Sequence, residues 1–193
     1  MIISPSRLQA LRAAIEEAAS SIAEDLRRAG SFPFDLSVPR AALCSLGEFP
    51  ERAVFCGEEM MASVLVSYGG RLLGTSVLSL EPRHALELIR SLEAQGNPLD
   101  DFRRAGASLL RGMLGCFASA GGSPVAFGDP ILEERSLVAT VLGTHAPPST
   151  MVVSLEVSFA SASRTIPAYA YLLLDAKTLR AGLGLLGERG LGA

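Results

Sequence analysis

The chain has 193 residues, of which 49% are hydrophobic and 19% are charged. This composition excludes an intrinsically disordered chain, which combines low hydrophobicity with high net charge. The formal net charge of -3 disfavours a nucleic-acid-binding surface, which is normally basic.

The first predicted element is a long amphipathic helix over residues 5–28. Ser4 is a suitable N-cap, Pro5 suits the first helical position, and Gly30 suits the residue that follows a helix. Apolar residues recur at steps of three and four along one face, namely Leu8, Leu11, Ile15, Ala18, Ile22 and Leu26. We expect this face to be buried.

Strands and a second helix are predicted to complete the first half. In chain order, the sequence predicts an extended segment over 32–39, a loop over 45–52, a brief strand over 53–57, strands over 61–68 and 72–80, and a helix from Pro82 to near Gly96. Gly69 and Gly70 indicate a two-residue type I′ turn between the two longer strands.

The second half shows a similar order of elements. The sequence predicts a helix over 99–120, strands over 123–127, 136–142, 151–159 and 166–174, and a helix over 175–187. Pro39 and Pro130 are 91 residues apart, as are Leu8 and Leu99. These spacings indicate an internal duplication.

The predicted fold is a single α+β domain over residues 1–193, built from two pseudo-symmetric halves. The halves cover about residues 5–96 and 97–187, and residues 188–193 are predicted to form a flexible tail. The predicted sheet is antiparallel, with the two long helices and the shorter helices packed against it. A possible homodimer would join sheets edge to edge.

The sequence shows no motif for export, membrane insertion, metal binding or cofactor binding. It has no run of about 18 apolar residues, and the N-terminus lacks the pattern of a signal peptide. The cysteines Cys44, Cys56 and Cys116 form no CxxC pair, and His84 and His145 have no nearby second ligand. We therefore expect a cytoplasmic protein with reduced thiols that binds no metal, cofactor, membrane or nucleic acid.

The repeated long helix and its proline resemble the CheC/CheX chemotaxis phosphatase family, whose motif is Asp/Ser-x3-Glu-x2-Asn-x22-Pro. The equivalent positions here are Gln9, Ala13, Glu16 and Pro39 in the first half, and Asp100, Arg104, Ala107 and Pro130 in the second. The prolines and the spacings match in both halves. The Glu and the Asn of the motif are replaced in both, and only Asp100 keeps its family type.

The resemblance implies a protein that binds the receiver domain of a response regulator, with weak or lost phosphatase activity. In the family, the amide orients a water molecule for attack on an aspartyl phosphate, and the Glu pairs with a basic residue of the partner. The expected partner-binding residues are Gln9, Glu16, Ser20, Asp100, Arg104 and Arg111. Asp100 and Arg104 are also spaced to form an ion pair.

Three alternatives remain open at this stage. The chain also resembles the middle domain of the flagellar switch protein FliM, which implies a structural component. After the receiver-binding protein and the structural component, the third hypothesis is an active phosphatase that uses Glu16 or Asp100 in place of the family's residues. Finally, the polar stripes are also typical of the solvated face of any amphipathic helix.

Overall fold

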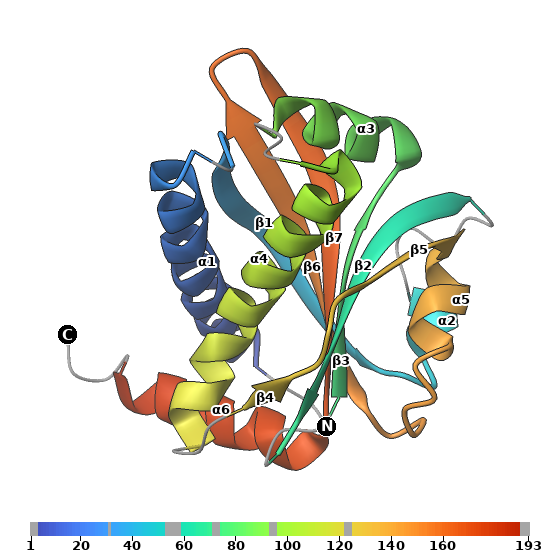
Figure 1. Ribbon diagram of the computed structural model, residues 1–193. Helices are drawn as coiled ribbons and strands as arrows, with labels where there is room; N and C mark the ends of the chain where they lie inside the picture. The colour runs from blue at the N-terminus through green and yellow to red at the C-terminus, as the bar shows by residue number, and fades with distance from the viewer. Residues whose placement is uncertain are drawn as a thin grey trace.

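The computed structural model describes residues 4–30, 32–52, 59–70, 74–92, 96–121 and 125–189. These residues form an α+β fold with one seven-stranded sheet and helices on both faces (Figure 1), which confirms the predicted fold class. The elements are α1 (Pro5–Arg28), β1 (Asp35–Ser45), α2 (Phe49–Arg52), β2 (Met60–Gly69), β3 (Gly74–Leu80), α3 (Pro82–Ser91), α4 (Pro98–Gly121), β4 (Ala126–Phe127), β5 (Ile131–Ser136), α5 (Leu137–Leu142), β6 (Met151–Ser161), β7 (Arg164–Leu174) and α6 (Ala176–Arg189).

The sheet is antiparallel and has the strand order β1-β6-β7-β3-β2-β4, with β5 also paired to β2. The order reads the same from either edge when β1 is matched with β5, β2 with β6 and β3 with β7. A duplicated chain would produce this order, and we propose on this basis that residues 5–96 and 97–187 are equivalent halves. The predicted homodimer would have to form at β1 or at the β4–β5 edge, and it stays a prediction.

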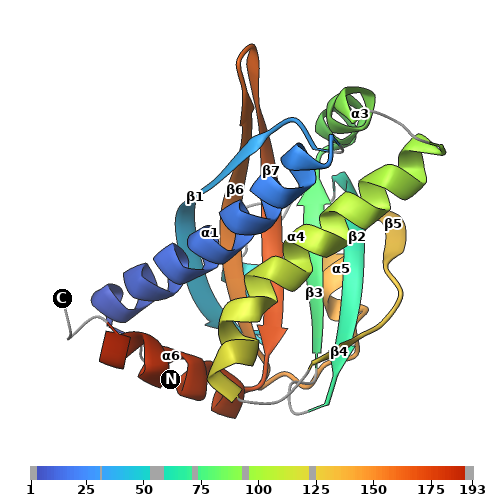
Figure 2. The same ribbon diagram turned by 60° about the vertical axis from the view of Figure 1, so that its left-hand side comes forward.

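Both faces of the central strands are buried, and each face has its own apolar layer. Successive residues of a strand point to opposite faces, so Leu172 of β7 packs beneath α1 and α4, whereas Leu173 packs beneath α2 and α5. Phe32 is in edge-to-face contact with Phe159 below the long helices, with ring centroids 5.4 Å apart. Figures 1 and 2 show that α1 and α4 lie side by side and run in opposite directions.

The helix termini follow the signals in the sequence. The hydroxyl of Ser4 accepts a hydrogen bond from the N–H of Arg7, so Ser4 is the predicted N-cap of α1. Asp175 accepts hydrogen bonds from the N–H groups of Lys177 and Thr178 and so begins α6. The helix α6 extends to Arg189, two residues beyond the predicted end, and the rest of the predicted tail lies outside the described residues.

The strand predicted over residues 136–142 is wrong, because residues 137–142 form the helix α5 and the strand β5 ends at Ser136. Short apolar runs do not distinguish a strand from a buried helix by periodicity. The hydroxyl of Ser136 accepts a hydrogen bond from the N–H of Ala139, and this N-cap starts the helix.

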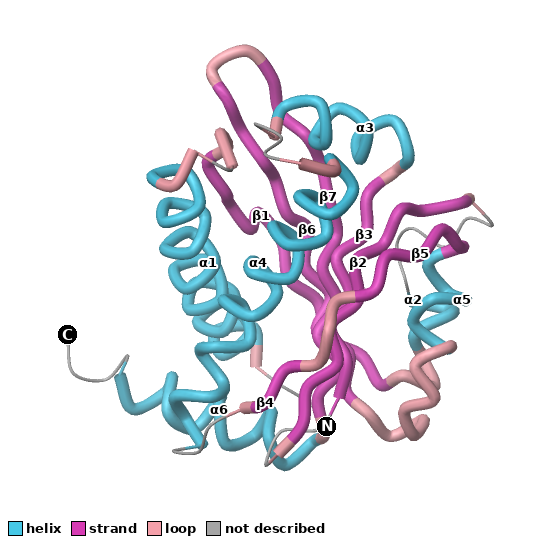
Figure 3. Tube along the Cα trace, viewed as in Figure 1, coloured by secondary structure: helices cyan, strands magenta, loops and turns pink. Residues whose placement is uncertain are grey.

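The two-residue turn at Gly69 and Gly70 is also wrong. Tyr68 pairs with Gly74, and β2 ends at Gly69, so more than two residues separate the paired positions of β2 and β3. Other predicted segments also differ from the fold, whose helices, strands and loops are shown in Figure 3. The predicted loop 45–52 includes the short helix α2, and β1 is longer than the predicted segment 32–39. The described part of segment 123–127 contains only the two-residue strand β4, and the strand predicted over 53–57 lies outside the described residues.

The two long helices approach each other closely at Gly112 of α4. A Cβ atom at this position would lie 2.5 Å from Cγ1 of Ile22 and 3.4 Å from the carbonyl oxygen of Ala18, both on α1. A Cβ atom at Gly115, one turn further along the same helix, would have no other atom within 4 Å. Gly112 therefore sets the distance between α1 and α4.

We predict that Gly112→Ala lowers the free energy of unfolding by about 1–3 kcal/mol, because the new methyl group would push the helices apart. The matched variant Gly115→Ala should raise it by about 0.5–1 kcal/mol through the higher helix propensity of alanine. Chemical denaturation followed by circular dichroism measures both values. Equal stabilisation by the two variants would contradict the close approach at Gly112.

Candidate functional site

Glu16, at the position of the motif Asn in the first half, lies on the side of α1 that contacts the edge strand β1. Glu16 accepts a hydrogen bond through Oε1 from the N–H of Val38, at 3.0 Å. Arg12 donates to the carbonyl oxygen of Val38, and its Nη1 lies 2.7 Å from Oε2 of Glu16. One turn further, the hydroxyl of Ser20 donates to the carbonyl oxygen of Leu36 at 3.1 Å. Three side chains of α1 therefore bind the backbone of β1.

The backbone at Val38 needs these partners because β1 is irregular there. The register between β1 and β6 shifts between Ser37 and Arg40, so neither Val38 nor Pro39 has a paired residue on β6. Proline lacks an N–H group and is tolerated in a sheet at an edge or at such a bulge. A buried N–H group without a partner costs about 1–3 kcal/mol. The carboxylate of Glu16, whose side chain is 29% exposed, removes this cost.

The remaining motif positions of the first half are exposed. Gln9 lies on the surface of α1, where its side-chain oxygen accepts a hydrogen bond from Nε of Arg12 at 3.3 Å. Ala13 and Pro39 are also exposed. Of the three partner-binding residues predicted here, only Gln9 presents its side chain mainly to solvent, because Glu16 and Ser20 bind the strand.

In the second half, the motif positions are distributed differently. Ala107, at the position of the motif Asn, is 1% exposed and belongs to the core beneath α4. The predicted ion pair between Asp100 and Arg104 is wrong. Asp100 pairs with Arg103 at 2.9 Å, and Arg104 pairs with Asp101, each at a spacing of three residues. Arg104 nevertheless keeps a side chain that is 66% exposed.

Arg111 contacts the segment that leads to the second motif proline. Its Nη2 donates to the carbonyl oxygen of Gly128 at 3.3 Å, and its guanidinium lies 5.5 Å from the ring centroid of Phe127. This cation–π contact and the hydrogen bond link β4 and Gly128 to α4. Arg111 therefore has a structural role similar to that of Ser20 on α1.

The predicted partner-binding residues form two stripes, one on α1 (Gln9, Glu16 and Ser20) and one on α4 (Asp100, Arg104 and Arg111). The fold does not bring these two stripes together at one site. Gln9 and Arg104 lie near the starts of α1 and α4, and these helices run in opposite directions (Figure 2). The two residues therefore lie towards opposite ends of the helix pair. A partner that contacts one stripe need not contact the other.

The opposite face of the sheet carries a row of polar residues that sequence reasoning missed. The strand registers align one polar residue from each of six strands in a line across the sheet, in the order Arg40, Glu156, Tyr169, Ser79, Ser63 and Glu133. Nη1 of Arg40 lies 2.9 Å from Oε1 of Glu156. The buried hydroxyl groups of Ser63 and Ser79 are hydrogen-bonded at 2.7 Å. This polar row crosses the apolar layer beneath α2 and α5, where Met61 and Leu65 flank Ser63 along β2.

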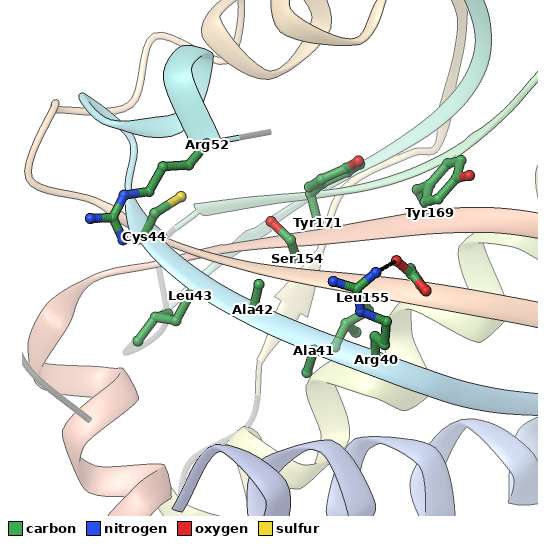
Figure 4. Close-up of a pocket in the computed structure, with 11 residues that line it drawn as sticks. Arg40, Ala41, Ala42, Leu43, Cys44, Arg52, Ser154, Leu155, Tyr169 and Tyr171 are labelled. Carbon is green, nitrogen blue, oxygen red and sulfur yellow. Dashed lines mark hydrogen bonds and ion pairs between the residues drawn. The ribbon is translucent and has the colours of Figure 1, made fainter. Parts of the chain in front are cut away.

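A groove of about 270 Å³ lies beside the polar row, between α2 and the strands β1, β6 and β7 (Figure 4). Its lining combines apolar surface with a few polar groups, including Ala42, Cys44, Arg52, Ser154, Tyr169 and Tyr171. The alternation of polar and apolar residues along 151–159 was the available signal for this face. The contribution of β1 and α2 could not be inferred without the strand order.

The pKa values of two groups of the groove, the Cys44 thiol and the Tyr169 phenol, are raised, so both stay protonated near neutral pH. Burial raises the pKa of the Cys44 thiol, and the nearby carboxylate of Glu48 raises it further. Burial also raises the pKa of Tyr169, with smaller contributions from the carboxylates of Glu156 and Glu81. A thiol and a phenol in their neutral forms are poor nucleophiles. Neither Cys44 nor Tyr169 is therefore an activated nucleophile near neutral pH.

Within the described ranges, no three His, Cys, Asp or Glu side chains lie close enough together to hold a metal ion. Among the helices described there, none is both long enough and apolar enough to cross a membrane.

No family model matches the sequence, and no curated protein matches it. Solved structures match over most of the chain. FliY from Thermotoga maritima has a TM-score of 0.73 at 13% identity, covering 97% of this chain and 99% of that chain. The FliM middle domain from H. pylori has a TM-score of 0.64 at 11% identity, covering 94% and 99%. A CheX chemotaxis protein from Desulfovibrio desulfuricans has a TM-score of 0.50 at 10% identity, covering 88% and 99%.

We predict that Glu16→Ala lowers the free energy of unfolding by about 1–3 kcal/mol, because the N–H of Val38 and the guanidinium of Arg12 would lose their partner. The neighbouring exposed residue provides the control, and Glu17→Ala should change stability by less than about 0.5 kcal/mol. Urea denaturation of the two variants measures the difference. If both variants were equally stable, Glu16 would not be holding the strand.

Proposed function

The chain has the α+β fold that FliY, FliM and CheX share, and from this premise we propose that it is a cytoplasmic, non-catalytic protein-binding domain of a chemotaxis or flagellar signalling system. The observation that carries the proposal is the identity of the residues that occupy the motif positions. Neither half has the Glu or the Asn of the family, and the two positions of the motif Asn hold Glu16 and the buried Ala107.

The chemistry of these substitutions supports the loss of phosphatase activity. An amide can accept a hydrogen bond from water and donate one to a phosphoryl oxygen, whereas an ionised carboxylate only accepts. The carboxylate oxygens of Glu16 already bind the N–H of Val38 and the guanidinium of Arg12. Asp100 is paired with Arg103. The third hypothesis, a phosphatase that uses Glu16 or Asp100, therefore has little support from the geometry.

The receiver domain of a response regulator is the first partner that we propose, because the family resemblance implies it. The layer formed by α1 and α4, called the helix layer below, offers exposed polar side chains for such a contact, above all Gln9 on α1 and Arg104 on α4. Because these residues lie towards opposite ends of the layer, we propose that a receiver domain binds at one stripe at a time. Arg104 suits a partner surface that carries carboxylates.

A structural role in the flagellar switch is the second candidate. The specific observation in its favour is the degree of structural likeness, which is greater to FliY and to the FliM middle domain than to CheX. A structural component needs a stable surface and no catalytic groups. The side chains of Glu16, Ser20 and Arg111 fit this role, because they hold β1 and β4 in place.

We predict that the protein leaves the rate of acyl-phosphate decay on a chemotaxis receiver domain unchanged within about twofold, since the groups that would position water are missing. We also predict that it binds the beryllofluoride-activated receiver domain. Arg104→Glu should weaken this binding about tenfold by reversing a surface charge. Radiolabelled phosphate release measures the decay, and biolayer interferometry measures the binding.

Arg135→Glu is the matched control, because Arg135 has a similarly exposed, ion-paired side chain on β5, away from the helix layer. Faster decay would contradict the non-catalytic proposal. Unchanged decay without binding would reject the receiver domain as partner and leave the structural role in the flagellar switch.

A further inference from the structure

The groove on the second face of the sheet is separate from every motif position. It lies on the side of the sheet away from α1 and α4, where α2 stands above the strands β1, β6 and β7 (Figures 1 and 4). Ala42 and the ring of Tyr171 give it apolar surface, and Ser154 contributes a hydroxyl group. The edge-to-face contact between Phe49 and Tyr171, with centroids 5.4 Å apart, fixes the orientation of the tyrosine ring.

Within the described part of the chain, the positive charge at the α2 end of the groove is only weakly compensated. The side chain of Arg52 is 62% exposed, and its ion pair with Glu48 is long, at 3.9 Å. Glu48 already accepts hydrogen bonds from the N–H and the hydroxyl of Ser45, at 3.1 and 3.0 Å. At the other end, by contrast, Arg40 is closely paired with Glu156 at 2.9 Å. An anion in the groove would therefore be drawn to Arg52.

The arginine also lies within electrostatic reach of the bottom of the groove. Figure 4 shows the Arg52 side chain extending beside Cys44, and its charge lowers the pKa of the Cys44 thiol, against the larger effect of burial. A guanidinium can hold a carboxylate through two parallel hydrogen bonds. Small-molecule sites typically combine mostly apolar walls with a few such polar groups.

We propose that this groove binds a small organic acid with one carboxylate on an aromatic or branched apolar body. Arg52 binds the carboxylate, Ala42 and the Tyr171 ring contact the apolar body, and the Ser154 hydroxyl adds a hydrogen bond. The volume of about 270 Å³ is just below the usual range for ligand sites, about 300–1,000 Å³, so the ligand is small, with about ten non-hydrogen atoms. For a ligand of that size we expect a dissociation constant of about 1 mM.

The test is a titration of the ¹⁵N-labelled full chain with phenylacetate, followed by NMR. We expect saturable shifts in the amides of β1, β6 and β7 around the groove. The uncharged phenylacetamide, which has the same shape, should bind at least about tenfold more weakly, because it lacks the charge that Arg52 pairs with. Arg52→Gln should weaken the binding of phenylacetate by a similar factor.

Two further variants separate the groove from general charge effects. Arg28→Gln removes a similarly exposed, ion-paired arginine from α1, on the other face, and should leave binding unchanged. Ala42→Phe fills the groove from an exposed strand position and should abolish the shifts without unfolding the chain. The same spectra verify that each variant is folded.

Three results would each overturn the proposal: no saturable shift with phenylacetate, equal binding of the acid and the amide, or undiminished binding to Arg52→Gln. The assay contains only the protein and the probe. Its outcome is therefore independent of whether the helix layer binds a receiver domain.

Discussion

The backbone of β1 at Val38 imposes the constraint on which the arrangement of the long helices depends. Because the bulge before Arg40 removes Val38 from the register with β6, its N–H and carbonyl groups need partners from elsewhere. Glu16 and Arg12 supply them and so dock α1 onto the sheet. The close contact at Gly112 then places α4 relative to α1. The helix layer is thus positioned from one irregular point in an edge strand.

The same constraint explains why the stripe on α1 is a poor candidate for chemistry. If the Glu16 side chain moved away to bind a partner, the buried N–H group of Val38 would lose its hydrogen bond, which costs free energy. In the second half the position equivalent to Glu16 is Ala107, which only fills the core. The two positions therefore have different structural roles: Glu16 makes a hydrogen bond to β1, whereas Ala107 packs in the core.

Elements with a long, regular pattern could be predicted from the sequence, because burial on one face imposes a clear period. The 24-residue helix α1 and the paired strands β6 and β7 are of this kind. The helix α5 could not, since six residues are too few to establish a period and the cap at Ser136 decides its structure. The polar row could not be predicted from the sequence either, because Arg40 and Glu156 become neighbours only through the strand order.

The strand order also constrains when each part of the chain can fold. The contacts of α1 with β1 join residues 16 to 26 positions apart, so they can form while the chain is still being synthesised. The ion pair of Arg40 with Glu156 spans 116 positions, and the first half joins the second through β3 and β7. Such distant pairings are slow to form. On the ribosome, β1 would therefore have α1 as its partner before β6 has emerged.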